Sequence, residues 1–369
     1  MNAVTGRFNE LGLAAAVVVT TYVLVSAPLR PTLRRSWPVV ALALWQLAAT
    51  SWSVRPTLSF SFAARWAVLA LFLVAFTTIA SPEIQLRLLS LGVTGGLVGA
   101  AILSLFVPEI RGKAPNGAIG PYSHRNFLAH ACGVLLVCAA GTFILRPKAW
   151  KQPFLAAVMA VVWILLSGSK TPLFAVAAAL LAGGVLYGVS SGLFRRYKSV
   201  VGVGFFGLAV CATVGFRLLG AKPLDTTLTG RTSIWGALLP EVRRSWLSGY
   251  GSGQAFFFTP RRLIVSERVG RDVPHAHNGY LDALLNSGVV TLSLICILLA
   301  FGVLASLRWS VRSPRRGCVL LMLVVCAAGL NITEPDFLDS MPLTLFLATI
   351  AATHRRSALH LRATDYSHA

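Results

Sequence analysis

Residues 285–306, LNSGVVTLSLICILLAFGVLAS, form an apolar run that contains no charged side chain. A stretch of this length can cross the hydrocarbon core of a bilayer as one helix. In lipid a helix is favoured because it satisfies its own backbone hydrogen bonds. Comparable runs recur along the 369-residue chain, in which 56% of residues are hydrophobic and only 12% are charged. The sequence therefore predicts an all-α, polytopic membrane protein that forms a single membrane domain over residues 1–369.

The apolar runs predict eleven membrane spans, and the charges between them predict their orientation. Lysines and arginines gather in alternate short loops and in the tail, which the positive-inside rule assigns to the cytoplasm. With eleven spans, this places the N-terminus outside and the C-terminus in the cytoplasm. The spans lie near residues 11–27, 37–53, 58–80, 86–107, 126–146, 153–168, 171–190, 199–219, 285–306, 316–332 and 339–353.

The net charge of +21 would suggest a nucleic-acid partner in a soluble protein. Here most of the excess lies in short loops between apolar segments, so membrane orientation explains it. We therefore expect membrane lipids around the chain and no nucleic acid bound to it. The sequence has no Walker loop, no dinucleotide fingerprint and no metal-ligand cluster, so we expect neither a cofactor nor a metal site.

One predicted outer loop, residues 220–284, is far longer than the other connections, and a loop of this length is usually functional. Apolar residues between Arg231 and Trp246 recur at helical spacing, which predicts a helix within the loop. The loop region is also basic, and positive charge kept on the outer face indicates an anionic ligand there. Its cations include Arg217, Lys222, Arg231, Arg243, Arg244, Arg261, Arg262, Arg268 and Arg271.

His277 and Asn278 stand where the loop ends and the next helix is expected to begin. The helix dipole and partial burial both favour a neutral imidazole at such a position. A neutral imidazole can accept a proton from a sugar hydroxyl. A hydrogen-bonded histidine at a helix cap would give the same local pattern.

The spacing of His277-Asn278, Gly288 and Thr291 resembles the signature of the O-antigen ligase and polysaccharide polymerase superfamily. Other elements resemble that family in the same order, over roughly residues 115–335. The last of them resembles an Asn-x-x-Glu element of exopolysaccharide polymerases in the superfamily. These elements are His124-Arg125-Asn126, Ser167-Gly168-Ser169-Lys170-Thr171, Gly230-Arg231 with Trp235, Gly249-Tyr250-Gly251-Ser252-Gly253 and Asn331-Ile332-Thr333-Glu334.

The resemblance implies a metal-independent glycosyltransferase of the bacterial inner membrane, without a cofactor, in which the 220–284 loop is periplasmic. Its donor would be a polyprenyl-pyrophosphate-linked oligosaccharide or polysaccharide. His277 would orient or deprotonate the acceptor hydroxyl. Asn278 and Glu334 would bind the acceptor or support the site.

Three cations are expected to bind the pyrophosphate, because guanidinium groups bind phosphate oxygens with charge-assisted hydrogen bonds. Arg231 is the first choice for this role, and Arg125 and Lys170 are the others. Each of them could instead be an ordinary interfacial cation that reaches towards the lipid headgroups.

The acceptor is left open by the sequence. Another lipid-linked glycan would make the protein a polymerase, lipid A-core would make it an O-antigen ligase, and a protein side chain would make it an oligosaccharyltransferase. The short elements favour an exopolysaccharide-type polymerase. The alternative of another class is a transporter or flippase of lipid-linked glycan without chemistry, which predicts ionisable residues near the bilayer midplane. The candidate residues gather at one face instead.

Overall fold

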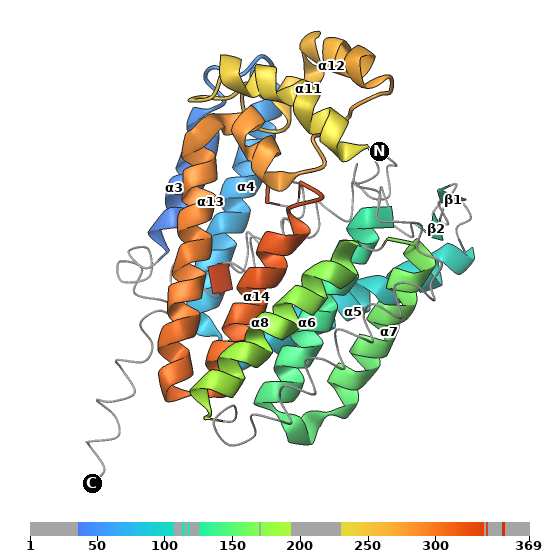
Figure 1. Cartoon of the computed structure of the whole chain (residues 1–369), viewed down its shortest axis with the longest axis vertical. Coiled ribbons are helices and arrows are strands. Elements are labelled where there is room, and N and C mark those ends of the chain that lie inside the picture. The colour runs from blue at the N-terminus through green and yellow to red at the C-terminus, as the bar shows by residue number, and fades with distance from the viewer. Residues whose placement is uncertain are drawn as a thin grey trace.

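A computed structural model describes residues 36–106, 113–114, 117–118, 125–169, 171–192, 230–335, 337–338 and 349–350. Within these ranges the regular secondary structure is helical apart from one short antiparallel hairpin, β1 (Lys113–Ala114) with β2 (Gly117–Ala118) (Figure 1). This confirms the all-α expectation. The helices are α3 (Trp37–Ala48), α4 (Pro56–Ile79), α5 (Pro82–Phe106), α6 (Arg125–Leu145), η2 (Pro147–Ala149), α7 (Lys151–Ser167), α8 (Thr171–Ser190), α11 (Arg231–Arg244), η3 (Ala255–Phe258), α12 (Arg261–Val269), α13 (Gly279–Arg312) and α14 (Pro314–Leu330).

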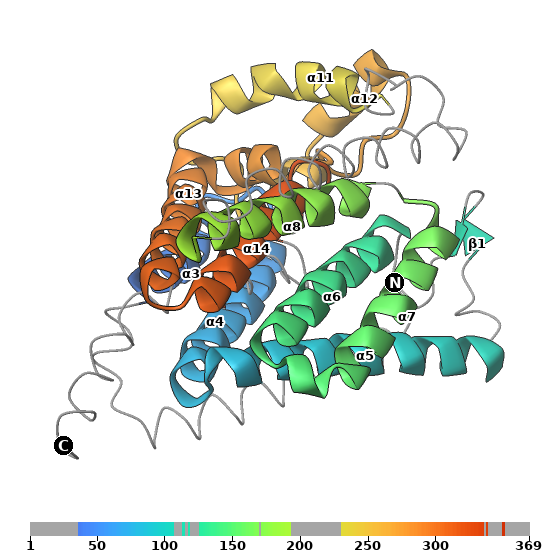
Figure 2. The ribbon, with the colours of Figure 1, turned by 60° about the horizontal axis from the view of Figure 1, so that its bottom comes forward.

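The long helices form a bundle in which α14 packs against α6, α8 and α13. On one side α3 packs against α4 and α13, and on the other α5 and α7 pack against α6. Buried apolar side chains such as Leu42, Val134 and Leu323 join α3, α6 and α14 into one core, and a second cluster that includes Leu135 and Ala160 joins α6 to α7. The helices α11 and α12 lie across one end of the bundle in both views (Figures 1 and 2). A polar cover thus sits on an apolar bundle.

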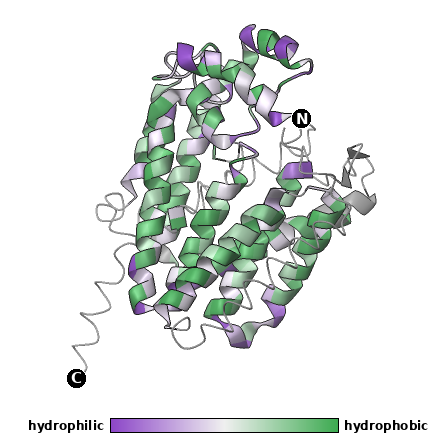
Figure 3. Cartoon of the chain, in the orientation of Figure 1, coloured by the Kyte–Doolittle hydropathy of each residue, from purple (hydrophilic) through white to green (hydrophobic). Residues whose placement is uncertain are grey.

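Four described helical segments are long and apolar enough to cross a membrane, and the apolar helices α3 and α7 are shorter. Large apolar side chains also point outward from the bundle: Leu155 of α7 is 67% exposed, and Phe174 of α8 is 58% exposed. Figure 3 shows hydrophobic residues over the bundle and hydrophilic residues gathered on α11 and α12. These features are those of a multi-pass membrane protein. The four segments are Pro56–Thr77, Arg125–Leu145, Thr171–Ser190 and Gly279–Arg312.

Several predicted spans and the start of the long loop lie outside the described residues. These are the spans near 11–27 and 199–219, nearly all of 339–353, and the loop segment 220–229. The count of eleven and the 220–284 loop as a whole therefore remain predictions. Within the described part, the helix expected from Arg231 is present as α11, and α13 begins at Gly279 rather than at residue 285.

The helix α13 is interrupted at Ser287 and Gly288, where the backbone leaves helical geometry. Gly288 has φ +73 and ψ −168, a combination open almost only to glycine. The break releases the carbonyls of Leu285 and Asn286, which accept hydrogen bonds at 2.8 Å from the N–H groups of Tyr250 and Gly251. The glycine turn after α11 is thereby fixed to the break in α13.

Buried polar side chains reinforce the same junction from α3. Gln46 donates from Nε2 to Thr291 Oγ1 at 3.1 Å, and its Oε1 accepts from Ser287 Oγ at 3.0 Å and Ser252 Oγ at 2.8 Å. A buried polar group costs free energy unless it has partners, so these residues stabilise one another. The positions of Gly288 and Thr291 in the family signature thus have a structural explanation, since both fasten the loop to the bundle.

Replacing Gly288 by alanine tests this junction. A Cβ at this position would overlap the Leu247 carbonyl and would force a side chain into the glycine region of φ and ψ. We expect Gly288→Ala to cost about 2–4 kcal/mol and to lower the thermal midpoint of the purified protein. Gly236→Ala is the matched control, because that helical glycine is exposed and has nothing within 4 Å of an added Cβ. Equal midpoints for the two variants would contradict the role assigned to Gly288.

Candidate functional site

The carboxylate of Glu334 lies fully buried where α11 and the loop before α13 meet the bundle. Its Oε1 accepts a hydrogen bond from Asn126 Nδ2 at 2.6 Å and one from Arg231 Nη2 at 2.7 Å. His277 Nδ1 lies 3.1 Å from Oε1 and 3.2 Å from Oε2. One carboxylate therefore joins residues of α6, of α11 and of the segment before α13.

Asn331 positions Glu334 by tying the end of α14 to the start of α13. Its Nδ2 donates to the Ala327 carbonyl at 2.9 Å, and its Oδ1 accepts from the Phe337 N–H at 2.9 Å. Its own carbonyl accepts from the Gly279 N–H at 2.8 Å. Gly279 permits this approach, because a Cβ there would overlap the Asn331 side chain. The Asn-x-x-Glu spacing thus turns the chain so that Glu334 faces His277.

Asn278 caps the N-terminus of α13 and so places His277 directly before that helix. Its Oδ1 accepts from the N–H groups of Tyr280 and Leu281, both at 3.0 Å, which is a standard N-cap arrangement. Its Nδ2 donates to the Ile332 carbonyl at 3.2 Å. The amide of Asn278 is thus used to start α13 and to hold the turn that carries Glu334.

The residue before His277 is held from two sides. The N–H of Ala276 donates to Asp282 Oδ1 at 3.0 Å, and its carbonyl accepts from Trp235 Nε1 of α11 at 3.0 Å. His277 itself has φ +50, in the left-handed region that few residues with a side chain adopt. The backbone of His277 is therefore fixed by its surroundings rather than by its own preference.

The contact with Glu334 defines the role of each ring nitrogen of His277. An ionised carboxylate can only accept hydrogen bonds, so Nδ1 of His277 carries the proton and donates. In the neutral ring Nε2 is then the acceptor. This is the arrangement of a histidine that can receive a proton while a carboxylate holds it in place.

Glu334 is ionised in this setting. Burial alone would raise the pKa of its carboxyl group, but the hydrogen bond from His277 and the electrostatic interactions with His277, His275 and Arg231 lower that pKa from 4.5 to about 2. A buried charge persists only where it is paired and hydrogen-bonded. The site thus holds a fixed negative charge surrounded by cationic and polar donors.

Two of the residues expected from the sequence, His277 and Arg231, therefore lie within hydrogen-bond distance of the carboxylate of a third, Glu334. Arg125 is the first residue of α6, next to Asn126, at the same end of the bundle. Lys170 lies outside the described residues.

The cluster also contains two residues that were not expected from the sequence, Asn126 and His275. Asn126 stands within a quoted family element, but spacing alone gave no reason to prefer it to Arg125. His275 lies with its ring centroid 3.9 Å from that of His277, and its Nδ1 is 3.9 Å from Glu334 Oε2. The spacing of His275 and His277, two positions apart, is the sequence signal that could have predicted a role for His275.

The donor atoms of His275, His277 and Glu334 lie within 4.8 Å of one another, and such a set could hold a metal ion. However, Glu334 Oε1 already accepts from Asn126 and from the Arg231 guanidinium. His277 Nδ1 carries the proton given to Glu334, so His277 would offer its Nε2 atom to a metal ion, as metal-ligating histidines held by a carboxylate do. The same Nε2 atom is therefore the one that can accept a proton or bind a metal ion.

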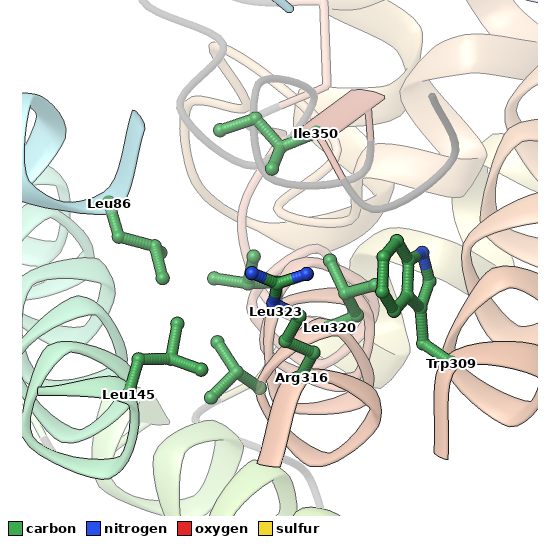
Figure 4. A pocket seen from close by; sticks show the side chains of 8 residues that line it. Leu86, Leu145, Trp309, Arg316, Leu320, Leu323 and Ile350 are labelled. Atoms are coloured by element: carbon green, nitrogen blue, oxygen red, sulfur yellow. The ribbon is translucent and has the colours of Figure 1, made fainter. Parts of the chain in front are cut away.

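An apolar pocket lies at the other end of α14 (Figure 4). Arg316 lies in its wall and donates from Nε to Glu83 Oε1 at 3.0 Å, so its charge is paired. Arg316 stands near the start of α14, and roughly 21 Å of helix separates it from the end of α14 at Leu330, which Glu334 follows. The pocket is otherwise apolar, and the carboxylate cluster is the candidate site.

The low pKa of Glu334 predicts how stability changes with acid. A lowered pKa in the folded state means that the charged carboxylate stabilises the fold above pH 4.5, and this contribution is lost as pH falls towards about 2. We expect the thermal midpoint of the wild type to fall more steeply across this window than that of Glu334→Gln. Glu267→Gln, at an exposed position of α12, should keep the wild-type slope. Parallel slopes for wild type and Glu334→Gln would contradict the assignment.

Comparisons with known proteins agree with the motifs. Residues 155–296 match the O-antigen ligase family. The exopolysaccharide production protein ExoQ of Rhizobium meliloti (strain 1021) is 26% identical over 350 residues, which cover 88% of this chain and 79% of that protein. The family match includes Arg231 and His277, whereas Asn126 and Glu334 lie outside it. The resemblance of this multi-pass membrane protein to the O-antigen ligase and polysaccharide polymerase superfamily is thus confirmed.

Proposed function

We propose that this chain is a glycosyltransferase that uses a polyprenyl-pyrophosphate-linked glycan as donor at the periplasmic face of the inner membrane. The family supports a role in polysaccharide polymerisation or ligation. The name of the similar Rhizobium protein favours polymerisation of an exopolysaccharide. The observation that carries the proposal is the hydrogen bond from His277 Nδ1 to Glu334, because it leaves Nε2 as the proton acceptor.

In the proposed reaction, Nε2 of His277 takes the proton of an acceptor hydroxyl. The hydroxyl oxygen attacks the anomeric carbon of the donor, and the bond from that carbon to the pyrophosphate oxygen breaks. The bonding electrons leave with the polyprenyl pyrophosphate. Water or the departing phosphate then takes the proton from His277. Glu334 stabilises the imidazolium that forms in between, since its charge lies 3.1 Å from Nδ1.

Arg231 is the proposed contact for the departing pyrophosphate. Its Nη2 meets Glu334, and a guanidinium carries four further N–H donors in a rigid fork. The pairing with Glu334 therefore fixes the guanidinium while donors remain for phosphate oxygens. Its side chain is 10% exposed, so its field is weakly screened. Arg125 and Lys170 are proposed as further cations for the pyrophosphate.

The proposed mechanism needs no metal ion. Arg231 supplies the fixed positive charge that a metal would otherwise bring to the leaving group. The acceptor is proposed to be a second glycan chain. Lipid A-core and a protein side chain are the other acceptors that the same site would allow.

The proposed topology has eleven spans and a cytoplasmic C-terminus. The turns between α6 and α7 and between α13 and α14 lie at the end of the bundle opposite α11 and α12 (Figure 1). Both turns are short and basic, and the positive-inside rule applies to cations in short loops, which supports a cytoplasmic position for that end. Their cations are Arg146, Lys148, Lys151, Arg308, Arg312, Arg315 and Arg316.

Transfer by purified protein tests the proposed chemistry. The substrate is a polyprenyl-pyrophosphate oligosaccharide, and EDTA is present throughout. We expect the wild type to lengthen the glycan, His277→Ala to lose about 100- to 10,000-fold in rate, and Arg231→Ala to lose about 100-fold or more. Arg268→Ala, at an exposed position of α12, should keep the wild-type rate.

The outcomes of this assay separate the alternatives. An active His277→Ala variant would overturn the proposed base, and activity that needs an added divalent ion would overturn metal independence. A single addition to lipid A-core instead of a ladder of products would favour ligation. A wild type that moves the lipid across a vesicle bilayer without changing the glycan would establish the transporter alternative.

Cysteine labelling tests the topology. Arg268→Cys in α12 should react with a membrane-impermeant maleimide in intact spheroplasts, because α12 is proposed to face the periplasm. Lys148→Cys, exposed in η2 at the opposite end, should react only after lysis. Wild type serves as the blank for the native cysteines. The reverse pattern would place the candidate site in the cytoplasm and would contradict the use of a periplasmic donor.

A further inference from the structure

His275 contacts the backbone of His277 as well as its ring. The N–H of His277 donates to His275 Nδ1 at 3.3 Å, and the two ring centroids are 3.9 Å apart. His275 is 16% exposed in its side chain, so the contact is largely shielded from solvent. The Nδ1 atom of His275 is therefore an acceptor here, which places the proton of its neutral ring on Nε2.

The same nitrogen also lies 3.9 Å from Glu334 Oε2. That separation is beyond hydrogen-bond range, and it would be an ion pair only with a proton on Nδ1. His275 Nδ1 cannot carry a proton and accept the N–H of His277 at the same time. In this structure it accepts the N–H, so it carries no proton. His275 thus acts on His277, and its effect on Glu334 is secondary.

The backbone of His277 needs such a contact. With φ +50, His277 lies in a conformation that is unfavourable for a residue with a side chain. Asparagine and aspartate commonly stabilise turns of this kind by accepting the N–H two residues on. In histidine Nδ1 is bonded to Cγ, as Oδ1 is in asparagine. His275 therefore makes an Asx-like turn with an imidazole.

We propose that His275 is a positioning residue that holds His277 in its left-handed conformation and so directs His277 Nδ1 at Glu334. This rests on the proposed function of His277 as the base. If the turn relaxes, the imidazole of His277 moves off the carboxylate and its Nε2 off the acceptor hydroxyl. A misplacement of about 1 Å can cost about 100-fold in rate, so the effect should appear in kcat.

Three substitutions at one position separate the acceptor atom from the ring. His275→Ala removes both, His275→Phe keeps a ring beside His277 without an acceptor, and His275→Asn keeps the acceptor without the ring. We expect kcat to fall about 10- to 100-fold in His275→Ala and His275→Phe and to recover in His275→Asn to within about fivefold of the wild type. The KM for the lipid-linked donor should stay within about twofold in all three, because Arg231 is untouched.

The thermal midpoint of each variant keeps positioning apart from loss of fold, and if His275→Ala does not fold, the asparagine and phenylalanine variants decide. Full activity in His275→Ala, or equal loss in the asparagine and alanine variants, would overturn the proposal while leaving His277 as the base. An active His277→Ala variant would overturn the proposed function, and the positioning role would fall with it.

Discussion

The rest of the site depends on the free energy required to bury the charge of Glu334. A carboxylate removed from water is stable only where donors surround it, and removal of one partner of a buried pair leaves an uncompensated charge. The donors come from residues far apart in sequence: Asn126 opens α6, Arg231 opens α11, and His277 precedes α13. The need to satisfy one carboxylate therefore brings three segments to the end of α14.

The break in α13 determines where the covering segment can sit. The residues after α11 hydrogen-bond to carbonyls that an unbroken helix would use itself. Gly288 allows this approach, and Gln46 fills the junction with matched polar groups. The same loop carries Arg231 and, further along, His277, so this docking sets the positions of the guanidinium and the imidazole relative to Glu334.

Apolar runs predicted the membrane helices well where burial in lipid determines them, and predicted their polar ends less well. The span expected at 171–190 coincides with α8, and that at 126–146 differs from α6 by one residue at each end. The helix expected to begin at His277-Asn278 does begin there, as α13 from Gly279, whereas the apolar run placed the span itself only from residue 285, because Gly279–Leu284 is partly polar. The order of the family-like sequence elements along the chain indicated that His277, Arg231 and Glu334 belong to one site. The contact between Asn126 and Glu334 spans 208 positions, and no local spacing encodes it.

The position of one proton links the carboxylate to the proposed mechanism. If Nδ1 of His277 carries it, Glu334 orients the ring, Nε2 is a base, and the positive charge for the leaving group must come from a residue such as Arg231. If Nε2 instead binds a metal ion, Nδ1 still donates to Glu334, but the lone pair of the proposed base is no longer available. Arg231 favours the first state, because its guanidinium already compensates Glu334 at 2.7 Å and would repel a second cation. The proposed metal independence therefore depends on Arg231, whereas the proposed base depends on the hydrogen bond from His277 Nδ1 to Glu334.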